Sequence, residues 1–157
     1  MVEISFDVPA EPCVLVETTR LAHPPAQVWT AYTEPIFLRQ WWAPHGYTNS
    51  EVELDVRPGG PWKVTQADPE GNTFSFYGHF ERVEPRSLLA CTFISELFPE
   101  VLTWLRVDMA GTPTGTAVVT THRFPDDYHR TGYINLGGVE RMRESTERLD
   151  ALLRTMS

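Results

Sequence analysis

The chain has 157 residues, of which 41% are hydrophobic and 22% charged, and its formal net charge at pH 7 is −8. This size suits one domain with a sizeable core, so we expect residues 1–157 to form a single domain. The negative charge repels phosphate backbones and anionic membranes, and no apolar run approaches the ~20 residues of a membrane span. The composition therefore argues against a nucleic-acid partner and against a membrane partner.

The N-terminus and the cysteines bear on the cellular compartment. The opening residues, MVEISFDVPAEPC, are acidic and lack the basic start and apolar block of a signal peptide. Cys13 and Cys91 are the only cysteines and form no CxxC pair. A reducing cytoplasm is the simplest location, and no disulfide framework is expected.

The first part of the chain predicts a strand followed by two short helices. Residues 1–12 contain two prolines and little pattern, so they are expected to be a loose N-terminal segment or a sheet edge. Residues 13–22 are rich in β-branched side chains and predict a strand. Prolines 24 and 25 suit the first turn of a helix, where the missing amide donor costs nothing. A second short helix opens at Pro35, with residues 36–42 as its body.

The rest of the chain predicts a sheet and one long helix. Strands separated by the breaker clusters RPGGP, DPEGN, EPRS and GTPTG are expected at about residues 50–57, 62–67, 73–84, 87–94, 101–109 and 115–124. A final helix over about 135–156 has an apolar stripe made of Val139, Met142, Thr146, Leu149, Leu153 and Met156. The opposite face carries charges paired at i, i+4, which is typical of a solvated surface. The pattern predicts an α+β fold, with a curved antiparallel sheet of six to seven strands wrapped around a long C-terminal helix and two short helices after the first strand.

Strand alternation indicates which side chains face that helix. Phe74, Phe76, Gly78 and Phe80 share one face of their strand, and Leu105 lies on the apolar face of another together with Thr103. In the last strand, Thr120 and His122 alternate with outward-facing residues. An apolar cavity with a few convergent polar groups is the usual make-up of a small-molecule pocket. The alternative is a fully packed core whose polar groups bond to nearby backbone.

Signals for catalysis are sparse. None of the five histidines has the spacing of a metal ligand, and no glycine-rich nucleotide motif is present, so we expect neither a metal nor a cofactor. The DDYH segment at residues 126–129 is interpreted as a solvated loop. His122 is the one titratable residue that we consider a candidate functional group, because burial would make the charge of its ring sensitive to neighbouring groups. A satisfied core histidine is the alternative.

Several segments in order resemble a known family. They are TRLAHPPAQVWTAYTEP, FLRQWWAP, ELDVRPGGPWKV, DPEGNTFSFYGHFERVEP followed by RSLLACTF, GTAVVTTHRF, and RMRESTERLDALL. The chain resembles the SRPBCC superfamily, also called the START or birch-pollen-allergen fold. Within it, the chain is similar to homologues of the activator of heat-shock protein 90 ATPase. The resemblance implies a helix-grip fold in which an internal cavity commonly remains.

This fold suggests roles for the two adjacent tryptophans, Trp41 and Trp42. One ring is expected to plug the base of the core, and the other to line the cavity beside Trp62; the alternative is that both only fill space at a corner. The full set of expected cavity-lining residues is Trp41, Trp42, Trp62, Phe74, Phe76, Phe80, Phe93, Leu105, Thr120, His122, Met142 and Thr146.

Three functions remain open from the sequence. The first is a binding protein for a small hydrophobic ligand, apolar or aromatic. The second is an enzyme of the cyclase or hydrolase kind acting in the same cavity, with His122 and with Glu51 or Glu53 if strand parity turns these carboxylates inward. The third is a protein-interaction module related to the heat-shock ATPase activators. A homodimer also remains open, and fold alone does not decide among these functions.

Overall fold

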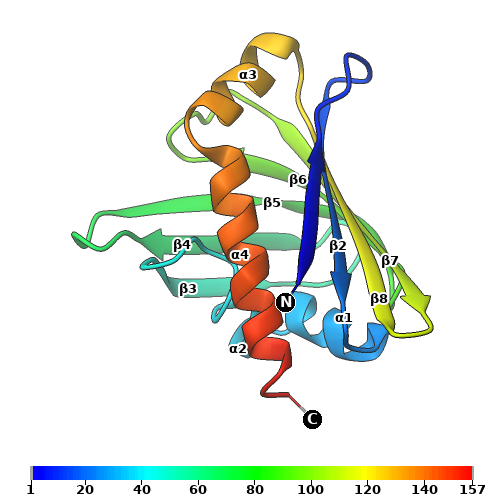
Figure 1. Cartoon of the computed structure of the whole chain (residues 1–157). Helices are drawn as coiled ribbons and strands as arrows, with labels where there is room; N and C mark the ends of the chain where they lie inside the picture. The colour runs from blue at the N-terminus through cyan, green and yellow to red at the C-terminus, as the bar shows by residue number, and fades with distance from the viewer. Residues whose placement is uncertain (1, 157) are drawn as a thin grey trace.

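The computed structural model describes residues 2–156. Its elements, in chain order, are β1 (Glu3–Asp7), β2 (Val14–Leu21), α1 (Pro25–Thr33), α2 (Pro35–Leu38), β3 (Thr48–Leu54), β4 (Pro61–Ala67), β5 (Thr73–Glu84), β6 (Leu88–Ser95), β7 (Thr103–Thr112), β8 (Gly115–Arg123), α3 (Asp127–Asn135) and α4 (Gly138–Leu153) (Figure 1).

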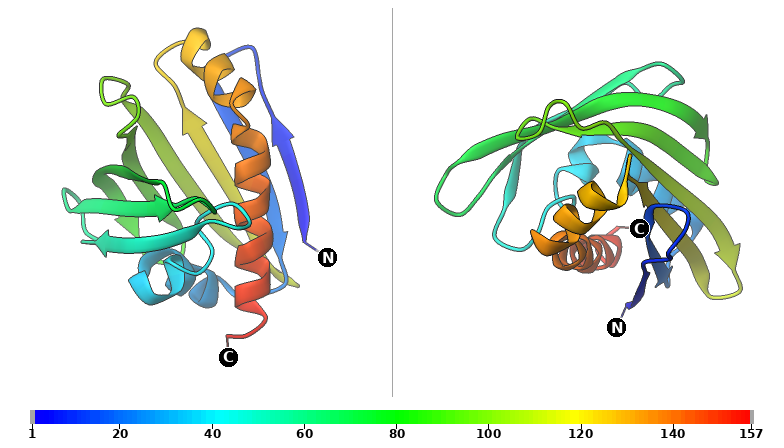
Figure 2. Two further views of the ribbon diagram at one scale, coloured as in Figure 1. Left: turned by 90° about the vertical axis from the view of Figure 1, so that its left-hand side faces the viewer. Right: turned by 90° about the horizontal axis from the view of Figure 1, so that it is seen from above.

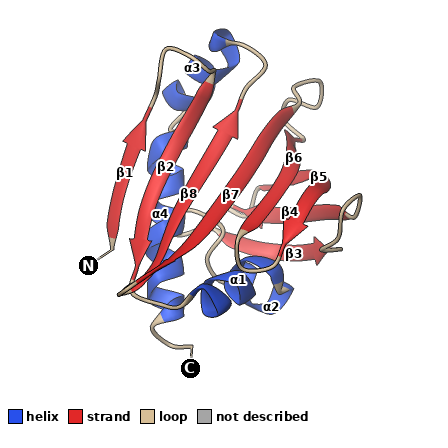
Figure 3. Ribbon diagram, turned by 90° about the vertical axis from the view of Figure 1, so that its right-hand side faces the viewer, coloured by secondary structure: helices blue, strands red, loops and turns tan. Residues whose placement is uncertain are grey.

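The strands form one curved antiparallel sheet in the order β1-β2-β8-β7-β6-β5-β4-β3. The sheet curls around α4, as the view from above shows (Figure 2). The short helices α1 and α2 lie together at one end of the sheet (Figure 3). This arrangement is the helix-grip fold that the sequence predicts.

The sheet has eight strands, where six to seven were expected. The additional strand is β1, which pairs with β2 through partners such as Ile4 with Thr19 and Phe6 with Glu17. Ile4 and Phe6 are half-buried while Glu3, Ser5 and Asp7 are exposed, so this segment has one apolar face to bury. Residues 3–7 are therefore a sheet edge, which is one of the two alternatives expected for them, and the other alternative, a loose segment, is wrong for these residues.

The C-terminal region contains two helices, where one was expected. Asp126 caps α3, because its carboxylate accepts a hydrogen bond from the backbone N–H of His129 at 2.9 Å. The predicted loop at residues 126–129 is therefore the start of a helix. Gly137 separates α3 from α4 with a left-handed φ of 89°, which glycine adopts without strain.

The apolar stripe of α4 lies against the sheet as expected. Thr146, Leu149 and Leu153 are 5%, 1% and 0% exposed, whereas Met142 at the upper end is only half-buried. Of the charged pairs expected on the opposite face, only the Arg154–Asp150 ion pair forms within residues 2–156. Arg148 instead donates to the carbonyls of Gln40, Ala43, Pro44 and Tyr47, so it fastens the loop after α2 to the helix.

Candidate functional site

Trp41 closes the base of the core. It is 3% exposed, its Nε1–H donates to the carbonyl of Ala31 at 2.9 Å, and its ring meets Tyr32 edge-on at 4.7 Å. Because α2 ends at Leu38, both tryptophans lie in the turn after the helix, not in its last turn as expected. Trp41 thus joins α1 to this turn and has no surface left for a ligand.

Trp42 faces in a different direction and remains half-buried. Its ring lies 5.8 Å from Trp62, 5.8 Å from Phe76 and 6.0 Å from Phe93, all in edge-on contact. Its backbone carbonyl accepts a hydrogen bond from the side chain of Gln66 at 2.8 Å, which fixes the turn against β4. The two neighbouring tryptophans therefore serve separate clusters.

Trp42 belongs to a continuous aromatic surface on the concave side of the sheet. We name it the aromatic wall and define it by Trp42, Tyr47, Trp62, Phe74, Phe76 and Phe93. Trp62 is buried, as is the neighbouring Phe80, but every other member of the wall is only half-buried. Leu105 and Met142, also expected at the site, are half-buried too. The concave face thus keeps aromatic and aliphatic surface that the protein itself does not cover.

Buried polar side chains lie beside the aromatic wall, on the part of the sheet that α4 and α1 cover. We name this set the polar patch and define it by Glu17, Thr103, Thr120, His122 and Thr146. The Thr146 hydroxyl donates to Glu17 Oε2 at 2.9 Å, and His122 Nε2 lies 2.8 Å from Thr103 Oγ1. Glu17 pairs with Thr120 across β2 and β8. His122 connects the patch to the wall, with its ring 5.1 Å from that of Phe93.

Glu17 is the inward carboxylate that the sequence reasoning missed. It is 4% exposed, and burial raises its pKa from 4.5 to about 7, although the hydrogen bond from Thr146 and the charge of Arg143 act in the opposite direction. Glu51 and Glu53, expected as candidates if parity turned them inward, are both exposed, so parity turns them outward. Strand alternation places Glu17 on the same face as Leu15, Thr19 and Leu21. The opposite face carries the apolar Val14 and Val16, so the sequence did not show which of the two faces lies inside.

The comparisons with known proteins agree with this architecture. The family model for the activator of Hsp90 ATPase homolog 1-like protein matches residues 22–154. The chain belongs to this family. No curated protein matches it closely enough to add a described activity.

Solved structures of similar chains include protein NE0264 from Nitrosomonas europaea, with 28% identity, a TM-score of 0.84, and coverage of 90% of this chain and 94% of that one. Protein Ms6760 from Mycobacterium smegmatis has 20% identity and a TM-score of 0.86, over 96% and 97% of the two chains. The AHSA1 (SPO3351) protein from Silicibacter pomeroyi has 21% identity and a TM-score of 0.76, over 92% and 99%. The last two likenesses concern the fold alone.

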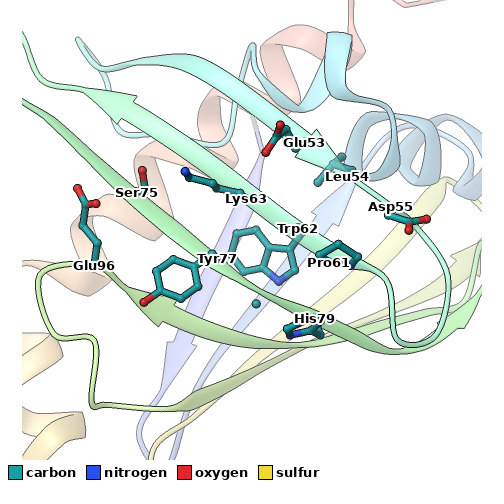
Figure 4. A pocket seen from close by; sticks show the side chains of 11 residues that line it. Glu53, Leu54, Asp55, Pro61, Trp62, Lys63, Ser75, Tyr77, His79 and Glu96 are labelled. Carbon is teal, nitrogen blue, oxygen red and sulfur yellow. The ribbon is translucent and has the colours of Figure 1, made fainter.

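Two open hollows of this protein lie away from the concave face. The larger, about 660 Å³, is an open groove on the outer side of β3, β4 and β5, where side chains such as Lys63, Tyr77 and His79 surround it (Figure 4). The smaller, about 330 Å³, lies at the β7–β8 turn beside Ala22–Pro25. Neither is the enclosed space expected between Trp62, Phe80 and Met142.

The described residues were also considered for a metal-binding cluster and for a membrane-spanning helix. Within residues 2–156, no three His, Cys, Asp or Glu side chains come together in a way that could hold a metal ion. Across the same residues, no helix combines the length and apolarity that crossing a membrane requires.

Proposed function

We propose that the protein binds a small apolar or aromatic ligand on its concave face, against the aromatic wall. The observation that carries this proposal is the wall itself: half-buried aromatic rings in mutual contact, beside a buried patch of polar groups. Apolar surface left in water is unfavourable by roughly 25 cal/mol per Å², so a ligand that covers these rings gains that free energy. Apolar surroundings with a few convergent polar groups are typical of small-molecule sites.

The outer groove is a weaker candidate for such a ligand. Its lining includes the carboxylates of Glu53, Asp55 and Glu96 and the ammonium of Lys63. An apolar ligand there would desolvate charged groups without pairing them, which costs free energy.

The neutral dye Nile red tests the proposal, because its fluorescence rises on transfer to apolar surroundings. We expect saturable binding, and we expect Phe76→Ala to raise the dissociation constant at least about tenfold, since a buried aromatic contact is worth about 1.5–3 kcal/mol. Tyr77→Ala is the matched control: Tyr77 is the next residue on β5, but it faces the outer groove. Unchanged binding by Phe76→Ala, or equal losses in both variants, would remove the ligand site from the concave face.

A second candidate function, an enzyme of the hydrolase kind, is favoured by one observation. Glu17 faces inward with a pKa of about 7, which suits a general base at neutral pH. On this hypothesis, 4-nitrophenyl butyrate is hydrolysed with a kcat/KM that rises as the pH passes through about 7. Glu17→Gln would reduce kcat/KM about 100-fold, the lower end of what a positioned base contributes. Equal rates for the wild type and this variant would exclude Glu17 as the base.

A further inference from the structure

Exposed apolar side chains are concentrated in the loop between β6 and β7, residues 96–102. Within residues 2–156, seven large hydrophobic side chains are exposed, and three of them, Leu97, Phe98 and Leu102, lie in this loop. We name these three the apolar tip; their exposed fractions are 62%, 49% and 40%. Single exposed apolar side chains are ordinary, whereas a cluster of them marks an interaction site. The tip therefore indicates a contact surface.

The loop that carries the tip is held in shape by its own hydrogen bonds. The amide of Phe98 donates to the carbonyl of Ser95, and the amide of Val101 donates to the carbonyl of Phe98, both at 3.0 Å, so that two turns follow one another. The amide of Glu96 donates to the carbonyl of Ser75 at 2.9 Å, which ties the loop to β5. A loop that is already ordered loses little conformational entropy when it binds a partner.

The same loop adjoins the outer groove of β3, β4 and β5. Glu96, its first residue, lines the groove together with Lys63 and Tyr77 (Figure 4). The register places Glu53, Lys63 and Tyr77 side by side on three neighbouring strands, and Ile94 of β6 beside Tyr77. Neighbouring strands lie about 4.8 Å apart, so about 14 Å separates β6 from β3, the length of about four to five extended residues. A short extended segment can thus reach from the tip across the groove.

The charge of the groove indicates the kind of segment. Its lining has three carboxylates, Glu53, Asp55 and Glu96, against the single ammonium of Lys63. Asp55 is paired with Arg57 at 2.9 Å, but within residues 2–156 neither Glu53 nor Glu96 takes part in an ion pair. A basic segment is attracted here without displacing an existing ion pair. A second copy of this chain, with its net charge of −8, or an anionic membrane is repelled.

We infer that the apolar tip and the outer groove together bind a segment of another protein, an extended stretch with apolar side chains at one end and lysine or arginine at the other. The apolar end covers Phe98 and the rest of the tip, and the basic side chains lie beside Glu96 and Glu53. The groove is on the outer side of the sheet, so this surface acts independently of the ligand site on the concave face.

Three synthetic peptides of equal length test the inference by titration calorimetry at low ionic strength. The first has leucine and phenylalanine followed by three lysines, the second has serine in place of the two apolar residues, and the third has glutamate in place of the lysines. We expect the first to bind at least about tenfold more tightly than either of the others, since both the apolar and the charged contacts contribute. Equal binding by the first two peptides shows attraction by charge alone and overturns the inference, as does absence of binding by the first.

Variants of the protein place the binding on this surface. Phe98→Ser should weaken binding of the first peptide at least about fivefold, because the exposed ring is the largest part of the tip. Ile36→Ser is the matched control, since Ile36 is equally an exposed apolar residue but lies on α2. Tyr77→Ala should weaken peptide binding and leave Nile red binding intact, and Phe76→Ala should do the reverse. Peptide binding that survives both Phe98→Ser and Tyr77→Ala overturns the inference, whatever Nile red does.

Sedimentation velocity separates a partner protein from a second copy of this chain. We expect the wild type and Phe98→Ser to sediment alike, as monomers. A wild-type dimer that Phe98→Ser dissociates would assign the surface to self-association and overturn the inference.

Discussion

Replacing Glu17 by glutamine is expected to stabilise the protein at pH 8 by about 3 kcal/mol and to leave its stability at pH 4 nearly unchanged. The pKa of this carboxyl rises from 4.5 to about 7 on folding, and each pKa unit corresponds to about 1.36 kcal/mol. Because the folded pKa lies above the unfolded one, the stabilisation is fully present below pH 4.5 and is lost as the pH rises to about 7. Glutamine keeps an acceptor for Thr146 but has no charge to bury.

His122 produces the opposite dependence over an overlapping range. Its pKa falls from 6.5 to about 3 on folding, so its contribution is present above pH 6.5 and is lost as the pH falls towards 3. Between about pH 4.5 and 6.5 the two effects cancel in the wild type. In the Glu17→Gln variant only the effect of His122 on the pH dependence of stability remains, so stability should rise continuously with pH up to about 6.5.

Urea unfolding at a series of pH values measures both curves. Glu51→Gln is the matched control, because Glu51 is exposed on β3 and its neutralisation should have little effect at any pH. The charged and titratable groups that act on Glu17 or are affected by it are Arg143 on α4, Tyr32 on α1 and Tyr133 on α3. A Glu17→Gln variant that is no more stable than the wild type at pH 8 would show that the folded protein holds this carboxylate ionised at no cost.

Much of the sheet interior was predictable, because side chains along a strand point alternately to its two faces. Because side chains alternate along a strand, the order of residues 73–84 was enough to separate Phe76 and Phe80 from Tyr77 and His79. The same counting placed Thr120 and His122 inside, and both are buried. The order of elements and the family resemblance then supplied the helix-grip topology.

The failures share a physical cause, which is dependence on a distant partner. The pairing of Glu3–Asp7 with β2 could not be read from two half-buried apolar residues in a short acidic segment. Glu17 was missed because β2 carries apolar residues on both faces, one covered by α4 and the other outside. The hydrogen bond from Thr146 that accompanies its burial comes from a helix 129 residues further along the chain. By contrast, the Asp126 cap of α3 was a local signal that could have been recognised.

Replacing Gly78 by alanine is expected to lower the stability by about 3 kcal/mol or more, in the upper range for overpacking a closed interior. Gly78 pairs with Trp62 on β4, and the Trp62 indole donates from Nε1 to the carbonyl of Thr92 on β6 at 3.0 Å. A Cβ on residue 78 would lie 2.1 Å from that same carbonyl oxygen. The added methyl must therefore separate β5 from β6 or displace the carbonyl from the indole.

The site depends on the same glycine. Trp62 supports Trp42 and Phe93 in the aromatic wall, with ring centroids 5.8 and 5.7 Å away, so a shift of β5 relative to β6 moves the surface proposed for the ligand. We expect Gly78→Ala to weaken Nile red binding as well as to lower the urea midpoint. Gly132→Ala is the matched control: Gly132 lies in α3, nothing stands within 4 Å of an added Cβ, and alanine favours the helix. If both variants unfold at the wild-type midpoint, the strands are free to accommodate a methyl group, and the close approach at Thr92 does not determine how the wall is held.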